Sequence, residues 1–305
     1  MPAGSGQAPS SLGGGQAPSF GRVVIAGVGL MGGSLGMALR LRGLASRVIG
    51  CDPDRSALEE ALRLGAIDEP APLASAARDA DLVVLAAPVP AFPHLLTALA
   101  GAVPPEAVLT DLGSVKRPVL NAATVLPRPQ RFVGGHPVAG KETAGVQSAN
   151  PTLFQDHAFA VVPPPGADAD AVQRVWALAE ALGARPLLLD AEEHDRLVAG
   201  VSHLPQVAAY ALAAAVWDAV AGPLDSPAAA RILAGAGYRD TTRLANSPPE
   251  LWRDLALANR EHLLPSLASL RQHLDAMAQA LEAEDGEALE VLFRGGRAGR
   301  VALTE

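Results

Sequence analysis

The sequence predicts an α/β protein in which a doubly wound, mostly parallel sheet comes first and an all-helical part follows. Short apolar runs alternate with helical patterns from Arg22 to Asp190, and no strand pattern follows Asp190. The first apolar run also ends in a glycine-rich turn that opens a helix. Alternation of this kind implies parallel strands joined by right-handed crossovers.

The composition suits helices packed on a sheet and excludes several other classes. Hydrophobic residues make up 49% of the 305 residues, but only 4% are aromatic, which favours a helix-covered sheet over a β-sandwich. The net charge is −8 and the basic residues are dispersed, so we expect no nucleic-acid partner. The single cysteine, Cys51, excludes a disulfide framework and a cysteine-based metal site, and we expect a cytoplasmic protein.

Two stretches bear on localisation. Residues 1–20 are rich in Gly, Ser, Pro and Gln and lack the basic start and apolar core of a signal peptide, so we predict a disordered tail. The longest apolar run, 207–216, is bracketed by Gln206 and Asp218 and is too short to cross a bilayer. It predicts a buried helix and no contact with a membrane.

The predicted elements follow in order from Arg22. Strands are runs of apolar residues, and helices show apolar residues at helical spacing and often end at a glycine. We predict strands at 22–29, 47–52, 81–88, 107–114, 131–137, 157–164 and 185–190, and helices at 30–43, 53–65, 91–101, directly after Ser114, and at about 168–182. Further helices are predicted at 191–219 with Pro205 inside, near 227–234, at 249–258, near 260–283 and near 285–293.

A domain boundary is predicted near 188–191, which separates residues 21–190 from the all-helical residues 191–305. The helices of the second part are rich in Ala and Leu and have apolar faces to bury. Packing against a second copy would bury them, so we expect a homodimer through this part.

The glycine-rich turn reads Gly27-Val28-Gly29-Leu30-Met31-Gly32, in the pattern G-x-G-x-x-G. It follows a strand and opens a helix, which is the context of a Rossmann-type dinucleotide site, and the helix N-terminus offers N–H groups to a pyrophosphate. Asp52 ends the second strand, where a carboxylate bonds ribose hydroxyls and repels a 2′-phosphate. The alternative is a glycine-rich turn with a helix-capping Asp. The predicted cofactor is NAD, bound by Gly27, Gly29, Leu30, Met31, Gly32 and Asp52.

Three later strand ends are expected at the same edge of the sheet. Ala87 and Pro88 would line the cofactor crevice or simply stop their strand. Ser114 would cap the helix that follows it, point its hydroxyl at a ligand, or do both. His136 lies among glycines at the end of another predicted parallel strand, where an imidazole would accept a proton at neutral pH. A structural or exposed histidine is the alternative.

Two polar stretches lie in the helical part. Arg239 and Arg243 would share one face of a helix and grip a carboxylate, although a salt-bridged surface helix is the plainer interpretation. His194, Asp195 and His203 are either polar surface or the wall of a cleft. Their spacing matches no metal site, so no metal is expected.

These motifs in this order resemble one family. GVGLMGGSLGMAL, DLGSVK, GGHPVAGKETAGV, EEHDRLVAGVSHLPQVAAYAL and GYRDTTRLANSPPELW are together similar to the prephenate/arogenate dehydrogenases of tyrosine biosynthesis, over residues 22 to about 290. That family uses NAD to oxidise a cyclohexadienol, which loses CO2 and becomes a phenol. The resemblance implies a small-molecule substrate, prephenate or arogenate, and a dimerisation role for the helical part.

The resemblance also implies roles for individual residues. His136 matches the histidine that accepts the proton of the ring hydroxyl, and Ser114 matches the serine that orients this hydroxyl. Arg243 matches the arginine that binds a substrate carboxylate, and Trp252 matches the tryptophan of the same motif.

Four other positions are singled out by the resemblance. Glu142 and Asp195 match acids that form a gate at the mouth of the site. Gln206 stands where the family often has a second histidine that faces the substrate, and Lys141 stands where Thr or Ser is common. Both departures bear on substrate binding.

Two other functions fit parts of the sequence. One is a dehydrogenase of similar build, of the β-hydroxyacid type or a pyrroline-carboxylate reductase. The lysine-dependent kind needs a lysine in the helical part, and none follows Lys141. The other is a non-catalytic NAD-binding dimer, against which His136, Ser114 and Arg243 argue.

Overall fold

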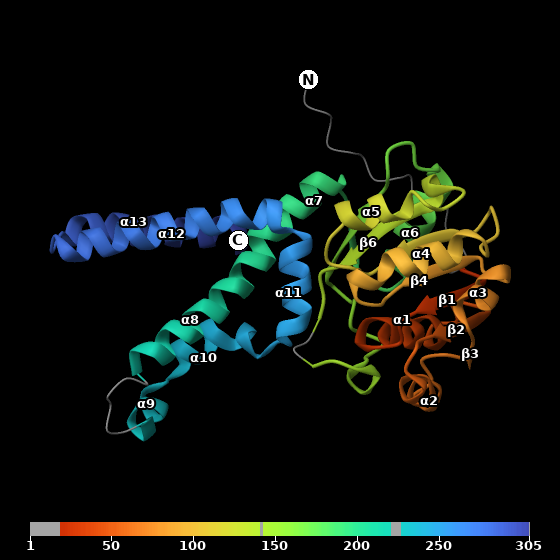
Figure 1. Cartoon of the computed structure of the whole chain (residues 1–305), viewed down its shortest axis with the longest axis horizontal. Coiled ribbons are helices and arrows are strands. Elements are labelled where there is room, and N and C mark those ends of the chain that lie inside the picture. The colour runs from red at the N-terminus through yellow and green to blue at the C-terminus, as the bar shows by residue number, and fades with distance from the viewer. Residues whose placement is uncertain (1–18, 141–142, 221–226, 305) are drawn as a thin grey trace.

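The computed structural model describes residues 19–140, 143–220 and 227–304. A sheet covered by helices forms one part, and an extended group of helices leads away from it (Figure 1). Almost all of the tail predicted at 1–20 lies outside the described residues. Phe20 was wrongly assigned to that tail, because its ring is buried in the core and its N–H donates to the Leu44 carbonyl oxygen at 2.8 Å.

The sheet has eight strands in the order β3-β2-β1-β4-β5-β6-β7-β8. The chain moves outward from β1 to β3 on one side and from β4 to β8 on the other, so the order reverses between β1 and β4. Ligands of such sheets bind at the carboxyl ends of the strands beside this reversal. The strands are β1 Arg22–Ala26, β2 Arg47–Cys51, β3 Glu69–Pro70, β4 Leu82–Leu85, β5 Val108–Asp111, β6 Phe132–Pro137, β7 Ala158–Val162 and β8 Arg185–Leu188.

The prediction of a mostly parallel sheet is confirmed, with one exception. β7 runs antiparallel to β6, whereas the other neighbouring pairs are parallel. In the described part, the connection from β6 to β7 holds a 3-10 turn at Val146–Ser148 but no α-helix. A parallel return needs a crossover, usually a helix, so the chain turns back beside β6 instead.

Alternate side chains of each strand face two separate cores, as the two-residue repeat of a strand requires. Val23 and Ile25 pack against α1 and α6, whereas Val24 and Ala26 pack against α3, α4 and α5. The sheet is therefore covered on both faces, and its carboxyl edge is left for ligands. These helices are α1 Leu30–Leu41, α2 Arg55–Arg63, α3 Leu73–Ala76, α4 Phe92–Ala100, α5 Arg117–Ala123 and α6 Ala169–Ala181.

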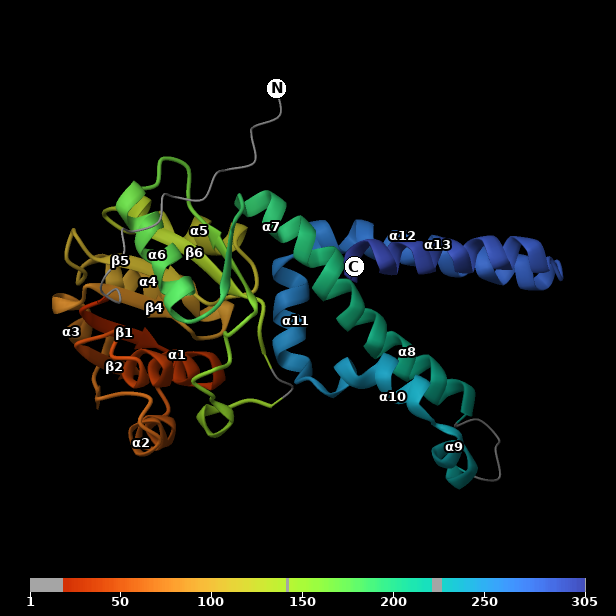
Figure 2. The same ribbon diagram turned by 180° about the vertical axis from the view of Figure 1, so that it is seen from behind.

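The helical part begins with a long rod that runs from the sheet-containing part toward α9 (Figure 2). A π turn at Ala199–His203 interrupts this rod, and α12 and α13 pack against each other as a hairpin. The prediction of helices throughout this part is confirmed, although α10 was not predicted and α13 extends to Thr304. The helices are α7 Ala191–Val198, α8 Leu204–Val220, α9 Pro227–Leu233, α10 Ala236–Thr242, α11 Pro249–Ala258, α12 Arg260–Glu282 and α13 Gly286–Thr304.

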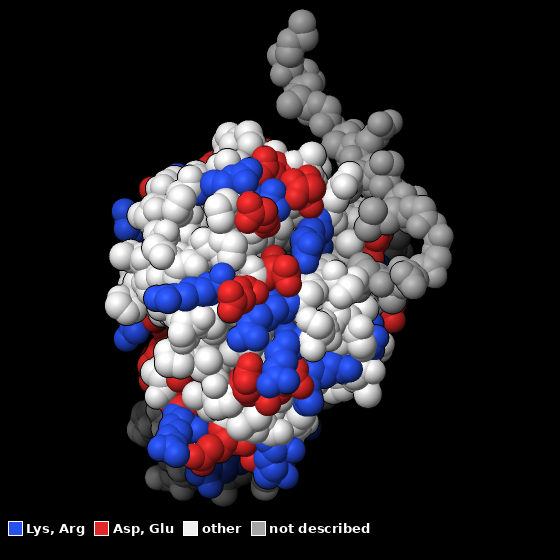
Figure 3. All heavy atoms as spheres, turned by 90° about the vertical axis from the view of Figure 1, so that its right-hand side faces the viewer, with Lys and Arg blue, Asp and Glu red and all other residues white. Residues whose placement is uncertain are grey.

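The helical part exposes much apolar surface in the single chain. The expectation that 207–216 forms a buried helix is wrong here, because only Gln206 and Ala209 of α8 are buried. Trp217 is 62% exposed and Phe293 is 60% exposed. Among the described residues, the rod Ala191–Val220 is the one helix long and apolar enough to cross a membrane, by length and composition only. By contrast, acidic and basic side chains are intermixed on the face of the sheet-containing part in Figure 3.

Candidate active site

The glycine-rich turn between β1 and α1 leaves no room for side chains at two of its glycines. Gly27 has φ +99°, and a Cβ there would lie 2.7 Å from the Ala86 backbone; a Cβ on Gly32 would lie 1.9 Å from the Gly27 carbonyl oxygen. A Cβ on Gly29 would meet no described atom within 4 Å, and no side chain caps α1. The backbone at Gly29 and the first N–H groups of α1, at Leu30 and Met31, therefore fit a pyrophosphate.

Asp52 follows β2 and faces this turn. Its Oδ2 accepts the Val28 N–H at 2.9 Å, and its Oδ1 accepts the Asp54 N–H at 2.9 Å. Each oxygen keeps a lone pair, and the side chain is half-buried, which fits a carboxylate that also accepts ribose hydroxyls. The alternative that Asp52 caps a helix is wrong, because Asp54 caps α2.

The segment after β4 lies against the same turn. The Gly27 Cβ position faces the backbone of Ala86 and Ala87, and a 3-10 turn begins at Val89, directly after Pro88. Ala87 and Pro88 are thus beside the glycine turn at the point where the strand order reverses, which is the place expected of cofactor-lining residues.

A fully buried ion pair joins Lys116 to Asp111 beneath the next strand ends. Lys116 Nζ also donates to the Gly135 carbonyl oxygen at 2.6 Å, and Asp111 accepts the N–H groups of Gly113 at 2.8 Å and Gly135 at 3.1 Å. Burial raises the pKa of Asp111 and lowers that of Lys116, while each charge opposes the shift of the other. The pair holds the loop that carries Ser114 against the residue before His136.

Ser114 is half-buried in this loop and does not cap α5, so the capping interpretation is wrong. α5 begins at Arg117, and its N-terminus is capped from the helical part instead. Asp195 accepts the Lys116 N–H at 2.7 Å and the Arg117 N–H at 2.9 Å. The hydroxyl of Ser114 has no hydrogen-bond partner in the described part of the chain, and it remains open to a ligand.

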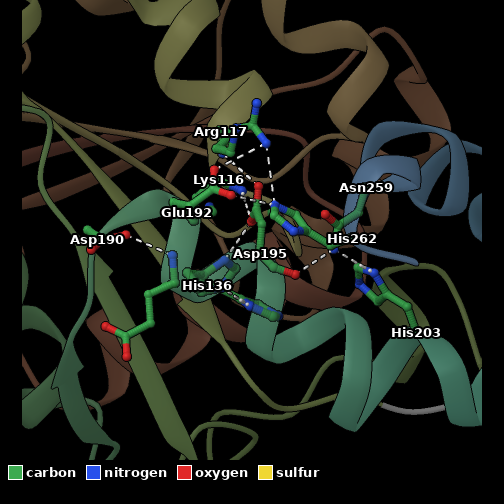
Figure 4. A network of polar contacts seen from close by, with 12 residues as sticks. Lys116, Arg117, His136, Asp190, Glu192, Asp195, His203, Asn259 and His262 are labelled. Atoms are coloured by element: carbon green, nitrogen blue, oxygen red, sulfur yellow. Dashed lines mark hydrogen bonds and ion pairs between the residues drawn. The ribbon is translucent and has the colours of Figure 1, made fainter. Parts of the chain in front are cut away.

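His136 lies near the end of β6 and is 7% exposed. Its Nδ1 lies 2.8 Å from His194 Nε2, and His194 Nδ1 lies 2.7 Å from Asp195 Oδ1. Figure 4 shows Asp195 between His136 and Lys116. Three buried side chains, two of them from α7, therefore form a hydrogen-bonded chain that ends at the strand edge.

The protonation of this chain follows from its last member. Burial by itself would raise the pKa of Asp195, but the bonds from His194, Arg117 and Lys116 outweigh it and lower that pKa. An ionised Asp195 only accepts, so His194 Nδ1 carries a hydrogen and its Nε2 accepts one from His136 Nδ1. Neutral His136 then has its lone pair on Nε2, which no described side chain occupies.

The pKa of His136 is lowered well below 6.5 by burial and by the positive charges that His194, Lys116 and His203 would carry. The imidazole is therefore neutral at pH 7 and ready to accept a proton. An exposed histidine, the alternative weighed from the sequence, is wrong.

His203 lies further along the same rod and is also buried. Asn259, between α11 and α12, donates to its Nδ1 at 3.1 Å and to the backbone carbonyl of Asp195 at 2.8 Å (Figure 4). The His203 ring meets Trp252 of α11 edge-on at 5.9 Å between centroids. The π turn, α11 and the start of α12 thus meet at His203, and Asn259 connects this group to Asp195.

Two of the predicted substrate residues of the helical part, Arg243 and Gln206, meet at the 3-10 turn Arg243–Asn246. α10 ends at Thr242, so Arg243 begins this turn, and its side chain is exposed in the single chain. Gln206 donates to the Leu244 carbonyl oxygen at 2.6 Å. The amide of Gln206 therefore anchors the turn that carries Arg243. Lys141 and Glu142 lie outside the described residues.

The prediction that Asp195 is an acid at the mouth of the site is wrong. It is 1% exposed, and its carboxylate is used by α5 and His194. The neighbouring Arg117 side chain contacts Glu192 at 3.2 Å and Glu261 at 3.0 Å. Figure 4 shows Glu192 and His262 beside Arg117.

Sequence reasoning missed the roles of several buried residues. Lys116 and Asp111 stood inside a quoted motif without a role, and the available signal was a lysine and an aspartate five residues apart at a strand end. His194 and His203 were left as surface or cleft wall. No local signal singled out Asn259.

Comparison with known families covers nearly all of the described chain. Residues 35–188 match the family profile of the prephenate dehydrogenase nucleotide-binding domain, and residues 190–295 match that of the prephenate dehydrogenase dimerization domain. Prephenate dehydrogenase of Bacillus subtilis is 34% identical over 284 residues, which cover 92% of this chain and 76% of that protein.

Two solved structures are similar over the whole fold. Prephenate dehydrogenase from Aquifex aeolicus, in complex with hydroxyphenyl propionate and NAD+, has a TM-score of 0.85 and 30% identity, and the match covers 94% of this chain and 100% of that one. Synechocystis arogenate dehydrogenase has a TM-score of 0.78 and 30% identity, with 92% and 99% covered.

Proposed function

The chain belongs to the prephenate dehydrogenase family, and on this premise we propose that it converts prephenate to 4-hydroxyphenylpyruvate, or arogenate to tyrosine. The cofactor is NAD, and the reaction is an oxidative decarboxylation. The observation that carries this proposal is the buried chain from Asp195 through His194 to His136, which leaves a neutral imidazole with a free Nε2 at the same edge of the sheet as the glycine turn.

The residues that fit NAD are those of the glycine turn, with Asp52 for the ribose and Ala87 and Pro88 along the crevice. When bound, NAD accepts the hydride that leaves the ring carbon. A carboxylate at Asp52 repels a 2′-phosphate, which favours NAD over NADP.

His136 Nε2 takes the proton of the ring hydroxyl as the hydride leaves the same carbon, and Ser114 orients this hydroxyl. The bond to the ring carboxylate then breaks, its electrons complete the aromatic ring, CO2 departs, and the proton returns to the oxygen. Arg243 binds a carboxylate of the substrate, and Trp252 contributes to substrate binding. The family resemblance extends substrate binding to Lys141 and a gating role to Glu142, both outside the described residues. The protein aligns groups and supplies a base, while aromatisation drives the reaction.

We assign residues 21–190 to NAD binding and residues 191–305 to dimerisation and substrate binding. The exposed apolar residues of the helical part, such as Trp217 and Phe293, fit a surface that a second copy covers. Light scattering at micromolar concentration is expected to give about twice the chain mass of 31.2 kDa, and the chain mass itself would contradict the dimer. A cytoplasmic location accords with this assignment.

The test of the function is NADH formation, followed by absorbance at neutral pH with NAD and either prephenate or arogenate. Turnover of one substrate identifies it, and turnover of both makes the protein a broad cyclohexadienyl dehydrogenase. The His136→Asn variant is expected to bind NAD normally and to lose about 10²- to 10⁴-fold in rate. Near-normal turnover in that variant would refute the assignment of His136.

A further inference from the structure

His203 has a buried nitrogen with no use in the described part of the chain. The residue is 1% exposed, and its Nε2 has no hydrogen-bond partner there. Burying a polar group unpaired costs free energy, so most such groups are paired in folded proteins. An unpaired one beside an active site suggests that its partner is a ligand.

Asn259, which contacts His203 Nδ1, shows whether the unpaired Nε2 needs a donor or an acceptor as its partner. Asn259 Nδ2 donates to the backbone carbonyl of Asp195, which only accepts, and this identifies the amide nitrogen. The same nitrogen faces His203 Nδ1 at 3.1 Å, so Nδ1 is the acceptor and Nε2 carries the hydrogen. Burial, with the positive charge that His194 would carry, outweighs Asp195 and lowers the pKa of His203 to about 4, which keeps the ring neutral. The unused group is therefore an N–H donor.

The backbone holds this donor in place. The π turn Ala199–His203 comes directly before α8, which has Pro205 at its second position. A proline cannot donate to the preceding turn and its ring crowds the carbonyl there, and a π turn absorbs the misfit; such turns are frequent at functional sites. Trp252 and Asn259 then hold the ring on two sides.

His203 lies near His136, because Asn259 joins the His203 ring to the Asp195 backbone, and His194, the residue before Asp195, contacts the His136 ring. The two imidazoles are in opposite states: His136 presents a lone pair on its Nε2, and His203 presents a hydrogen on its own. A ligand matched to both would carry a hydroxyl at one end and an anionic oxygen at another.

We propose that His203 is a substrate-binding residue whose Nε2–H donates to a carboxylate oxygen of the substrate. This inference rests on the proposed function, whose substrate carries a ring hydroxyl and two carboxylates. Arg243 accounts for one carboxylate, and His203 supplies a second, uncharged donor. An uncharged donor suits a carboxylate that must leave as CO2 or sit in a buried space, because it does not hold the charge as tightly as a guanidinium.

The test compares His203→Phe, His203→Gln and the control His94→Gln, which changes an exposed histidine on α4. Phe keeps a ring but removes both nitrogens, whereas Gln places an amide N–H near the position of Nε2. We would measure kcat and KM for the substrate, the affinity for NAD, and the affinity of the NAD-loaded protein for hydroxyphenyl propionate. Circular dichroism would check that each variant is folded.

We expect His203→Phe to lower kcat/KM about 10- to 100-fold, with NAD affinity unchanged, His203→Gln to recover most of the loss, and the control to match wild type. Weaker binding of hydroxyphenyl propionate as well would assign His203 to the side-chain carboxylate, and unchanged binding would assign it to the ring carboxylate. Unchanged kcat/KM in folded His203→Phe would overturn the inference, as would an equal loss in the Gln variant. Failure of the proposed function would instead appear as absent turnover in the wild type.

Discussion

Replacing Asp195 with Asn tests whether its carboxylate sets the protonation of His136 or only caps a helix. The carboxylate accepts three hydrogen bonds, from Lys116 N at 2.7 Å, Arg117 N at 2.9 Å and His194 Nδ1 at 2.7 Å. Oδ1 accepts two of them and Oδ2 accepts one. The substitution keeps the shape of the side chain but replaces one acceptor oxygen with an NH2 donor.

The expected loss of stability follows from this count. With its NH2 at the Oδ1 position, the new amide would face the Lys116 N–H, so one buried bond to a charged acceptor is lost at about 1.5–3 kcal/mol. The negative charge at the N-terminus of α5 is lost as well, at about 0.3–1 kcal/mol. We expect the free energy of unfolding in urea to fall by about 2–4 kcal/mol.

The expected loss of activity has a separate cause. In this orientation the same NH2 would donate to His194 Nδ1, and His194 Nε2 would then carry the hydrogen. His136 Nδ1 would become the acceptor and Nε2 would be protonated, which removes the base. Partners that orient a reacting histidine are typically worth about 10- to 100-fold in activity, so kcat at saturating NAD and substrate is expected to fall by that factor, with NAD affinity unchanged.

The matched control is Asp190→Asn, five residues earlier at the start of α7. Asp190 caps that helix by accepting the Glu193 N–H at 2.7 Å, and Asn caps as well as Asp. It is expected to change neither kcat nor stability measurably. A folded Asp195→Asn variant with wild-type kcat and reduced stability would refute the reasoning, because Asp195 would then act as a cap alone.

Three further predictions concern buried groups. Lys116→Met leaves the Asp111 carboxylate buried without its cation and is expected to cost about 3–5 kcal/mol in urea unfolding, whereas a cost below about 1 kcal/mol would mean that water reaches the pair. The pKa of His203 is about 4 in the folded protein and about 6.5 when unfolded, so the unfolded state binds more protons as pH falls from 6.5 to 4. Stability is therefore lost across that range, by up to about 3 kcal/mol for this residue, and His203→Phe should show a shallower pH dependence; an equal slope would contradict the buried neutral state. Burial, with the nearby Asp52, raises the pKa of Cys51 to about 12, so iodoacetamide at neutral pH should label this thiol only on unfolding, and rapid labelling of the native protein would show that it is accessible.

Local patterns in the sequence were enough to predict most strands and helices. The strand, the glycine turn and the helix at 22–41 lie within one stretch. The glycines there are required by local geometry, since Gly27 has a positive φ and Gly32 has no room for a side chain. The same holds for the helices after Ala191, whose periodicity is visible without any partner. His136 was predicted because its glycine neighbours mark a strand end at the ligand edge.

The sequence did not predict the chain of buried contacts that holds His136. His136 and His194 are 58 residues apart, Lys116 and Asp195 are 79 apart, and His203 and Asn259 are 56 apart. Burial and hydrogen bonds between such distant residues leave no local pattern. Asp195 was therefore predicted at the mouth of the site, and Ser114 was predicted to cap α5, although Asp195 caps this helix. The antiparallel β7 was missed for the same reason, since its direction depends on what it pairs with.

The sequence by itself therefore determined the fold class and indicated NAD as the cofactor, because the strand, the glycine turn and the helix that predict them are neighbours along the chain. Only the tertiary structure decided which nitrogen of each histidine carries the hydrogen. That choice is made by the partner on the other ring nitrogen, Asp195 through His194 for His136 and Asn259 for His203, and folding buries these partners together from distant parts of the chain.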